Sequence, residues 1–327
     1  MSSGGRPQQA AWWVLSFLVS GVLLYYALRG VDWAAVWHTL AGARWSYLAG
    51  GALITSGSFF LRSLRWRILL NAEGSFSVGT VFWANMAGYL GNNFLPARAG
   101  ELLRSVLIST RSALSKTYVL TTALSERLMD VIALVLGASL VLLRVNPKPR
   151  WMEDLSRTMA IAAAIGAVAI MVLPHTGTLV KTILARIPMP ARLRHALLHL
   201  AEQILLGMRA FHDWARFAGF VFLTLVIWAA DSTAAIIAAR ALGLSISFGV
   251  ALLLLTGLGL GSALPSTPGY VGVYQFVAVT ILTPFRISRD AALAYVLVLQ
   301  VSGYVVVALF GLPGLYLLQG GWLRMRK

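Results

Sequence analysis

The sequence predicts an all-α polytopic membrane protein with about six transmembrane helices and two re-entrant helical hairpins in an inverted repeat. Hydrophobic residues make up 58% of the 327 residues and charged residues only 12%, whereas about a quarter of an average soluble domain is charged. The apolar residues lie in long uninterrupted runs, and two of these runs end in Pro and Gly. The mean hydropathy of +0.77 and the absence of cysteine exclude a soluble enzyme, a disordered chain and a disulfide-stapled secreted scaffold.

Six apolar segments are long enough to cross a bilayer, because a hydrocarbon core of about 30 Å needs roughly 20 helical residues. The first segment is predicted to be a retained anchor rather than a cleaved signal, since its end offers no small-x-small cleavage site. The six predicted spans are residues 12–28, 45–61, 118–143, 158–173, 217–239 and 291–318.

Two further apolar stretches, residues 78–95 and 248–264, end at a proline and are followed by more helix-compatible sequence, at 100–110 and 269–283. A helix that breaks at membrane depth must satisfy its freed backbone groups inside protein or in a wet cavity. We therefore predict two re-entrant hairpins. The residues expected at their breaks are Pro96, Gly100, Pro265, Pro268 and Gly269.

The two hairpins belong to an internal repeat. Leu95-Pro96-x-x-x-Gly100 matches Leu264-Pro265-x-x-x-Gly269 at an offset of 169 residues. We expect a single membrane domain, with repeat 1 at about 43–143, a linker span and a cytoplasmic amphipathic segment at 144–214, and repeat 2 at about 212–318. One crossing between the halves would make the repeats inverted. Paired broken helices in inverted repeats are typical of a transporter's binding site.

The basic residues indicate the orientation in the membrane. The formal net charge is +16, and in so apolar a chain we expect the basic groups to face anionic lipid rather than nucleic acid. More Lys and Arg fall on the predicted side of the two termini, so both termini are expected in the cytoplasm. Arg62, Arg65 and Arg67, around Trp66, are interpreted as anchors that end the second span at this face.

Charged and amide residues near the breaks and within the apolar segments are the candidate substrate-binding residues, because charges at this depth are costly and usually functional. Arginine suits phosphate, since its planar fork donates two hydrogen bonds and stays charged. The acids would orient the arginines or carry protons. A structural alternative, compatible with binding, is that Arg98–Glu101 and Arg127–Asp130 are internal salt bridges. The candidates are Asn92, Asn93, Arg98, Glu101, Arg104, Glu126, Arg127, Asp130 and Asp231.

The sequence contains no Walker motif, no G-x-S-x-G, no H-E-x-x-H and no Asp-rich metal motif. We therefore expect no catalytic residues, no cofactor and no metal, and a protein that is not an enzyme.

Four motifs occur in an order that resembles a known family. They are Leu61-Arg62-Ser63-Leu64-Arg65-Trp66-Arg67, the stretch from Gly91 through Leu95-Pro96-Ala97-Arg98-Ala99-Gly100-Glu101 to Arg104, Ser125-Glu126-Arg127-Leu128-Met129-Asp130, and Leu264-Pro265-Ser266-Thr267-Pro268-Gly269-Tyr270-Val271-Gly272. Together they are similar to the transmembrane region of lysylphosphatidylglycerol synthases and its stand-alone relatives, the flippase-like integral membrane family, over roughly residues 10–318. The positions that match the family's motifs are Arg98, Gly100, Glu101, Arg104, Glu126, Arg127, Asp130, Pro265, Pro268 and Gly269.

The resemblance implies lipid translocation. In the bifunctional relatives the membrane half is implied to move an aminoacylated phospholipid to the outer leaflet, and a soluble half makes that lipid. Stand-alone relatives are linked to varied lipids, including polyprenyl-linked sugars and hopanoids. Because this sequence ends at Lys327 without a synthase half, lysyl transfer is not expected. The expectation is an ATP-independent flippase of the bacterial cytoplasmic membrane that moves a polar-headed, anionic or phosphate-bearing lipid by alternating access.

Two other functions stay open. One is a membrane-embedded lipid-modifying enzyme that acts on a polyprenyl phosphate, and the other is a non-transporting scaffold for a soluble lipid synthase. The expected partners are the membrane lipid substrate and anionic lipid at the cytoplasmic face. Two protein partners are possible, a separate lipid synthase and, by analogy, a second copy of the chain. No nucleic acid is expected as a partner.

Overall fold

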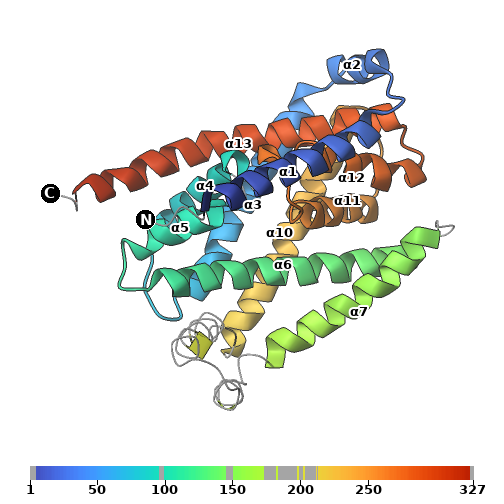
Figure 1. The fold of residues 1–327 in the computed structure, drawn as a ribbon. Coiled ribbons are helices and arrows are strands. Elements are labelled where there is room, and N and C mark those ends of the chain that lie inside the picture. The colour runs from blue at the N-terminus through green and yellow to red at the C-terminus, as the bar shows by residue number, and fades with distance from the viewer. Residues whose placement is uncertain are drawn as a thin grey trace.

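Every described element of the chain is a helix. The computed structural model describes residues 5–95, 99–144, 150–172, 182, 197–198, 202, 211 and 213–324. The elements before residue 173 are α1 (Gly5–Leu28), α2 (Trp33–Ala41), α3 (Trp45–Leu70), α4 (Val78–Phe94), α5 (Ala99–Ser109), α6 (Lys116–Arg144) and α7 (Arg150–Val172). Those after residue 213 are α10 (Trp214–Ala241), α11 (Phe248–Gly261), η4 (Pro268–Tyr270), α12 (Val273–Leu282), η5 (Thr283–Phe285) and α13 (Arg289–Arg324), as Figure 1 shows.

Polar side chains in the loops determine where several helices begin. Asp32 accepts hydrogen bonds from the first backbone N–H groups of α2, and Asp213 does the same for α10. Ser77 and Ser247 accept one such bond each at the starts of α4 and α11. Each cap satisfies N–H groups that the helix itself leaves without a partner.

The all-helical fold class is confirmed for the described residues, whereas the number of spans stays a prediction. By length and composition, two described helices qualify as spans, α10 and residues 289–318 of α13. α1 and α2 would together give a third if this pair, bent by 87°, is one broken span. α3 and α6 have 26 and 29 residues, which is long enough, but they carry the charged side chains described below. The predicted linker span coincides with α7, and most of residues 175–214 lie outside the described residues.

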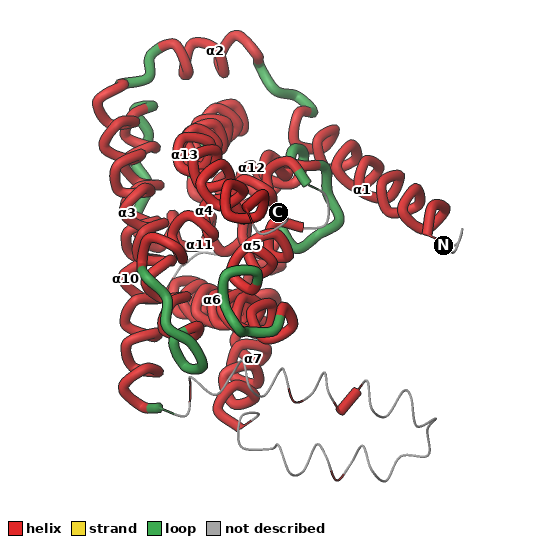
Figure 2. Tube along the Cα trace, turned by 90° about the vertical axis from the view of Figure 1, so that its left-hand side faces the viewer, coloured by secondary structure: helices red, strands yellow, loops and turns green. Residues whose placement is uncertain are grey.

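The same order of elements occurs twice, as a long helix, a broken pair and a long helix: α3, α4–α5 and α6, then α10, α11–α12 and α13. α3 and α10 lie side by side (Figure 2) and run antiparallel, because the Arg44 N–H at the start of α3 donates to the Ala241 carbonyl at the end of α10, 2.9 Å away. α6 and α13 also run in opposite directions in Figure 1. That the broken pairs are re-entrant, and enter from opposite membrane faces, stays a prediction.

Helices are exchanged between the two halves. α4 of the first half packs along α13 of the second, and α11 of the second half packs along α6 of the first. One hydrophobic core joins α10, α11, α12 and the start of α13, and another joins α3, α4, α5 and the start of α6. Phe220 of α10 and Leu318 of α13 reach into the first-half core, so these two helices extend from one core to the other.

The first break depends on the close approach of two helices. Gly88 and Gly91 of α4 lie against Gly100 of α5, and a Cβ added to Gly100 would lie 1.9 Å from the Gly88 carbonyl oxygen. Only a hydrogen atom fits there. Leu95 ends α4 in an extended conformation, and Pro96 lies outside the described residues.

The second break satisfies its backbone groups through side chains of the surrounding helices. The Gly269 carbonyl accepts hydrogen bonds from Gln300 Nε2 and from the Tyr304 hydroxyl. The Thr267 N–H donates to Ser20 Oγ of α1 (2.9 Å), and the Gly272 N–H donates to Gln275 Oε1 (2.7 Å). The chain turns here with positive φ at Gly269, Tyr270 and Gly272. These contacts meet the requirement for a break inside an apolar environment.

Candidate functional site

α3 carries two arginines that point into the protein. Arg65 has no exposed side-chain surface, and its two terminal nitrogens donate to both carboxylate oxygens of Asp130, at 2.7 and 2.9 Å. The same guanidinium donates to Glu126 Oε1 (2.9 Å) and to Thr224 Oγ1 (3.0 Å). Glu126 and Asp130 are one helical turn apart on α6, so both reach one arginine, as their spacing predicts.

Arg104 of α5 is the second fully enclosed arginine. It forms ion pairs with Glu101 (2.6 Å) and Glu126 (3.0 Å), and it donates to Asn85 Oδ1 (2.7 Å). Its guanidinium carbon lies 4.3 Å from the centre of the Trp66 ring. Glu126 therefore lies between Arg65 and Arg104 and links α3, α5 and α6.

Arg127 of α6 is less enclosed, with 23% of its side-chain surface exposed. Its Nε contacts Glu101 Oε1 at 3.0 Å, and its Nη1 lies 3.5 Å from Asp130. Its Nη2 donates to the Tyr89 hydroxyl (3.1 Å) of α4. The predicted Arg127–Asp130 salt bridge is thus confirmed, whereas Arg98 lies outside the described residues.

Arg62 joins the two halves of the chain. Its guanidinium is hydrogen-bonded to Asp231 of α10 and lies 3.7 Å from Asp130 of α6. The guanidinium carbon lies 4.9 Å from the centre of the Trp228 ring. Arg62 and Asp231 are 169 residues apart, which is the offset of the sequence repeat, so equivalent positions of α3 and α10 contact each other.

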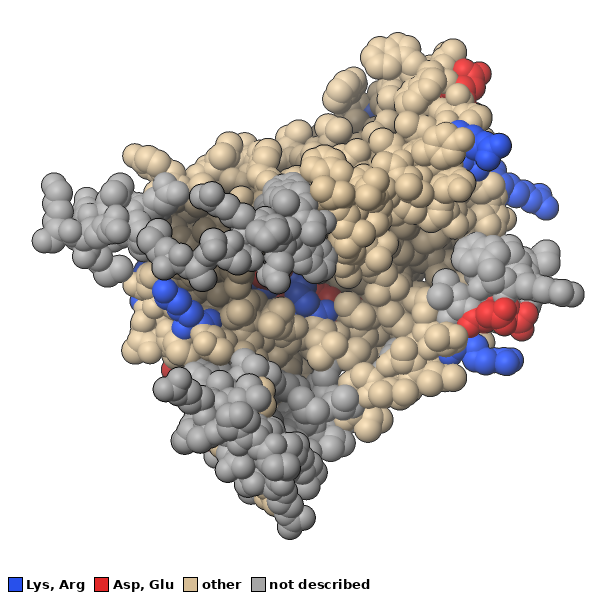
Figure 3. Space-filling model, viewed as in Figure 1, with Lys and Arg blue, Asp and Glu red and all other residues tan. Residues whose placement is uncertain are grey.

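These eight residues form what we call the charge cluster, and with all groups ionised their charges cancel. Removing one partner from such a buried pair costs about 3–5 kcal/mol, because an uncompensated charge remains. The members are Arg62, Arg65, Arg104, Arg127, Glu101, Glu126, Asp130 and Asp231. Figure 3 shows blue and red atoms together in the middle of a face that is otherwise largely uncharged.

A cavity of about 390 Å³ lies beside the charge cluster. Cluster residues that line it are Arg62, Glu101, Arg127, Asp130 and Asp231. The second half of the chain supplies an apolar wall with leucine and valine side chains of α11 and α13, together with Tyr270, Tyr274, Gln300 and Tyr304. The cavity therefore combines a few charged groups with a largely apolar lining, which is typical of a ligand site.

The structure brings most of the predicted site residues together. Asn92, Asn93, Glu101, Arg127, Asp130 and Asp231 all line the cavity. Arg104 and Glu126 are not among the lining residues. Arg104 contacts cavity-lining Glu101, and Glu126 contacts Arg65 and Arg104, which do not line the cavity. Gly100 lies at the contact between α4 and α5. Pro265, Pro268 and Gly269 belong to the second break, next to cavity-lining Tyr270.

The interpretation of Arg62 and Arg65 as interface anchors is wrong, because both are buried in ion pairs. Asn85, Tyr89, Trp228, Gln300 and Tyr304 were also missed. The available signal is the position of amide, hydroxyl and indole N–H groups within otherwise apolar helices, where an unsatisfied polar group is costly. Arg67, at the end of the same motif, donates to the Phe76 carbonyl (2.6 Å) and lies apart from the cluster.

Comparison with known proteins gives three findings. The profile of the family described as "Lysylphosphatidylglycerol synthase TM region" matches residues 13–311. The chain is 24% identical to "Glycosyltransferase AglD" of Haloferax volcanii, over 86% of this chain and 53% of that protein. It is 24% identical to a "UPF0104 membrane protein" of Methanothermobacter thermautotrophicus, over 91% of each chain. The chain thus spans about half the length of the first relative, and no solved structure matches it.

Proposed function

Because the chain belongs to the family of lysylphosphatidylglycerol synthase transmembrane regions, we propose that this multi-pass membrane protein is an ATP-independent lipid translocase. It would move a polar-headed, phosphate-bearing lipid across the bacterial cytoplasmic membrane by alternating access, with both termini in the cytoplasm. The observation that carries the proposal is a cavity that both halves of the chain line, with Arg62 and Arg127 among many apolar side chains.

Arg127 is the arginine best suited to bind a phosphate. Both carboxylates that it contacts have a second arginine behind them, since Glu101 is paired with Arg104 and Asp130 with Arg65. If Arg127 turns to a phosphate in the cavity, neither acid is left as an uncompensated buried charge. Asp231, in contrast, has Arg62 as its ion-pair partner within the described chain, so moving Arg62 would be costly.

The charged and the apolar lining residues of the cavity suit the two parts of a lipid. A charged headgroup is strongly disfavoured in hydrocarbon, and the charge cluster offers it arginines that are already desolvated and held in place. Leucine and valine side chains in the same lining suit the start of an acyl or prenyl chain. Since helices from both halves line the cavity, rocking of one half against the other would expose the headgroup to alternate membrane faces.

Reconstitution tests the proposal. Purified protein in liposomes should speed the transbilayer movement of labelled phosphatidylglycerol. Arg127→Gln should slow this movement about 10- to 100-fold, the equivalent of one charge-assisted hydrogen bond. The matched control is Arg144→Gln, since Arg144 is exposed at the end of α6, and it should transport as the wild type does. Equal transport by both variants would contradict the role of Arg127.

A lipid-modifying enzyme is the second candidate, favoured by the name of the glycosyltransferase relative and by the three acids Glu101, Asp130 and Asp231 at the cavity. The matched region covers 53% of that relative. Mass spectrometry of lipids incubated with the purified protein decides between the two. A new covalent product that depends on Asp130 would support the enzyme, and unchanged lipids that have crossed the bilayer support the translocase.

A further inference from the structure

A second cavity, of about 340 Å³, lies between α1 and α12 near the start of α13. We call it the α1–α12 groove. None of its lining residues belongs to the cavity beside the charge cluster. Its walls include the side chains of Tyr26, Phe276, Val279, Thr280 and Pro284, and Arg289 is its charged member. The volume lies within the range of about 300–1,000 Å³ that is usual for small-ligand sites.

Arg289 is held at the groove by the end of α1. Its Nη2 donates to the Tyr26 carbonyl (2.7 Å), one of the last carbonyls of this helix. The negative end of the helix dipole favours a cation at this position. Within the described chain, Nε and Nη1 of Arg289 have no hydrogen-bond acceptor and no carboxylate within 4 Å. These donors are therefore available to an anion at the groove.

The surface around the groove is positive. Arg29 directly follows α1, and Arg286 directly follows η5. Both side chains are exposed, and neither has a carboxylate partner among the described residues. The region also holds two acids, Asp32, which caps α2, and Asp290, which accepts the Asp32 N–H at 2.9 Å, so the arginines outnumber the carboxylates three to two. The face is predicted to lie opposite the termini, so cytoplasmic anchoring does not account for these arginines.

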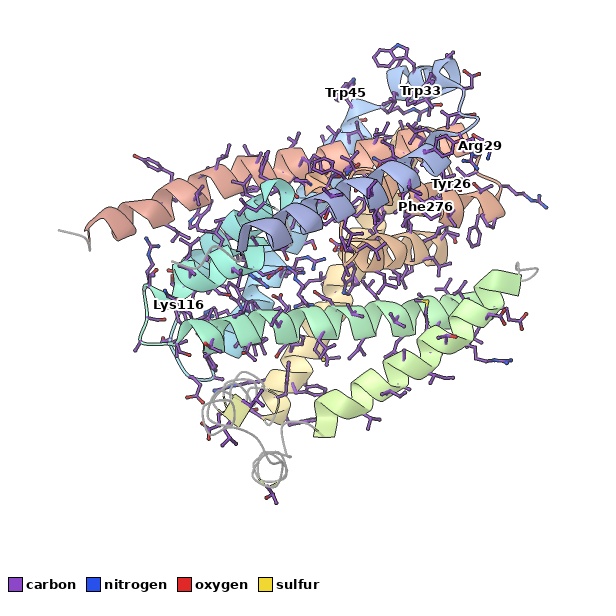
Figure 4. The ribbon with its side chains drawn as sticks, in the orientation of Figure 1. Tyr26, Arg29, Trp33, Trp45, Lys116 and Phe276 are labelled. Atoms are coloured by element: carbon purple, nitrogen blue, oxygen red, sulfur yellow. The ribbon has the colours of Figure 1, made fainter. Side chains whose placement is uncertain are left out.

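Aromatic side chains indicate that the groove lies at the depth of lipid headgroups. Tyr26 is 52% exposed and Trp33 57% exposed, and Figure 4 shows both at the same end of the molecule as Arg29 and Phe276. Exposed Tyr and Trp are enriched at the membrane–water interface. The groove is lined by apolar side chains of Phe276, Val279 and Pro284 together with Arg289, and so offers the two kinds of contact that a phospholipid requires.

We propose that the α1–α12 groove binds one anionic phospholipid of the surrounding bilayer, with its phosphate at Arg289 and one acyl chain along α12. The lipid would hold α1 against α12 and thereby against the second break, where Ser20 of α1 accepts the Thr267 N–H. This site is independent of the proposed translocation, because it shares no residue with the cavity beside the charge cluster.

Native mass spectrometry of the detergent-purified protein tests this site with two lipids of equal chain length, phosphatidylglycerol and phosphatidylcholine. The wild type should retain one phosphatidylglycerol more tightly than phosphatidylcholine. Arg289→Gln should weaken phosphatidylglycerol binding about fivefold, the effect of removing one basic group near the headgroup. It should weaken phosphatidylcholine binding less, because the choline cation already offsets the charge of that lipid's phosphate. Arg144→Gln, which removes an exposed charge elsewhere, is the matched control and should bind both lipids as the wild type does.

Because Arg289 also holds the end of α1, a second variant separates lipid binding from folding. Thr280→Phe fills the groove without touching that contact, and it should reduce the retention of both lipids at least fivefold. Equal retention of the two lipids by the wild type would overturn the proposal. So would unchanged phosphatidylglycerol binding in either Arg289→Gln or Thr280→Phe.

Discussion

Arg65 and Arg127 contact the same carboxylate, Asp130, from different surroundings. Arg65 is fully buried between Asp130 and Glu126, whereas Arg127 lines the cavity and is partly exposed. The low dielectric of the interior makes the loss of a buried charge much more costly than the loss of a partly solvated one. The two arginines should therefore differ in role, one holding the fold and the other available to a ligand.

Substitution of the two arginines by leucine separates these roles. Arg65→Leu should lower the free energy of unfolding by about 3–5 kcal/mol, because it leaves an excess of buried negative charge beside Glu126 and Asp130. Arg127→Leu should lower the free energy of unfolding clearly less, because Glu101 is still paired with Arg104 and Asp130 with Arg65. Thermal unfolding in detergent measures both. A larger loss of stability in Arg127→Leu than in Arg65→Leu would contradict the assignment.

At the scale of residues, the sequence identified the acids better than their partners. Glu126, Asp130 and Asp231 are charges inside apolar runs, and this made them candidates. Arg62 and Arg65 lie where an apolar run ends, which is also where interface anchors lie. Their ion-pair partners are 61 to 169 residues away, so only the packing of α3 against α6 and α10 distinguishes a buried arginine from an anchoring one.

At the scale of elements, apolar runs predicted where the helices lie but not all of their ends. The six predicted spans coincide with α1, α3, α6, α7, α10 and α13, and both broken pairs lie where Pro and Gly interrupt the pattern. α3 continues to Leu70, nine residues beyond its predicted end at 61, because buried carboxylates compensate its arginines. The nine-residue α2 was not predicted, since it is too short to produce a span-length pattern.

The contact between α4 and α5 gives a prediction at this scale. Gly100→Ala places a methyl group 1.9 Å from the Gly88 carbonyl oxygen, so the two helices must separate. We expect a loss of at least about 1–3 kcal/mol, as for other overpacked sites. Gly79→Ala in α4 is the matched control, because its Cβ meets nothing within 4 Å, and it should be neutral or slightly stabilising. Unfolding in denaturant compares the two, and a stable Gly100→Ala variant would show that α4 and α5 pack differently.

At the scale of the whole molecule, two helical cores are joined by α10 and α13, and the cavity is lined from both halves. The repeat in the sequence predicted the two halves and the order of their elements. It did not predict that α4 and α11 each pack on the other half, since matching motifs contain no information on which helices touch. The Arg62–Asp231 contact between equivalent positions arises from the packing of α3 along α10.

The orientation of the molecule in the membrane is tested by labelling. The sequence has no cysteine, so Arg29→Cys and Lys116→Cys each introduce a single reactive thiol. These two residues lie at opposite ends of the molecule in Figure 4. With both termini in the cytoplasm, a membrane-impermeant maleimide should label residue 29 in intact cells and residue 116 only after permeabilisation. Labelling of both thiols under the same condition would contradict the predicted orientation.

The central claim is that a lipid headgroup occupies the cavity beside the charge cluster, and filling that cavity tests it most directly. Gly303 of α13 lines the cavity, and a Cβ there meets nothing within 4 Å, so Gly303→Phe adds bulk without disturbing the ion pairs. Gly57→Phe in α3 is the matched control, because its Cβ also meets nothing within 4 Å and it lies outside the cavity lining. In liposomes, transbilayer movement of labelled phosphatidylglycerol should fall to the protein-free rate with Gly303→Phe and persist with Gly57→Phe. Transport at the wild-type rate by a folded Gly303→Phe protein would contradict the account.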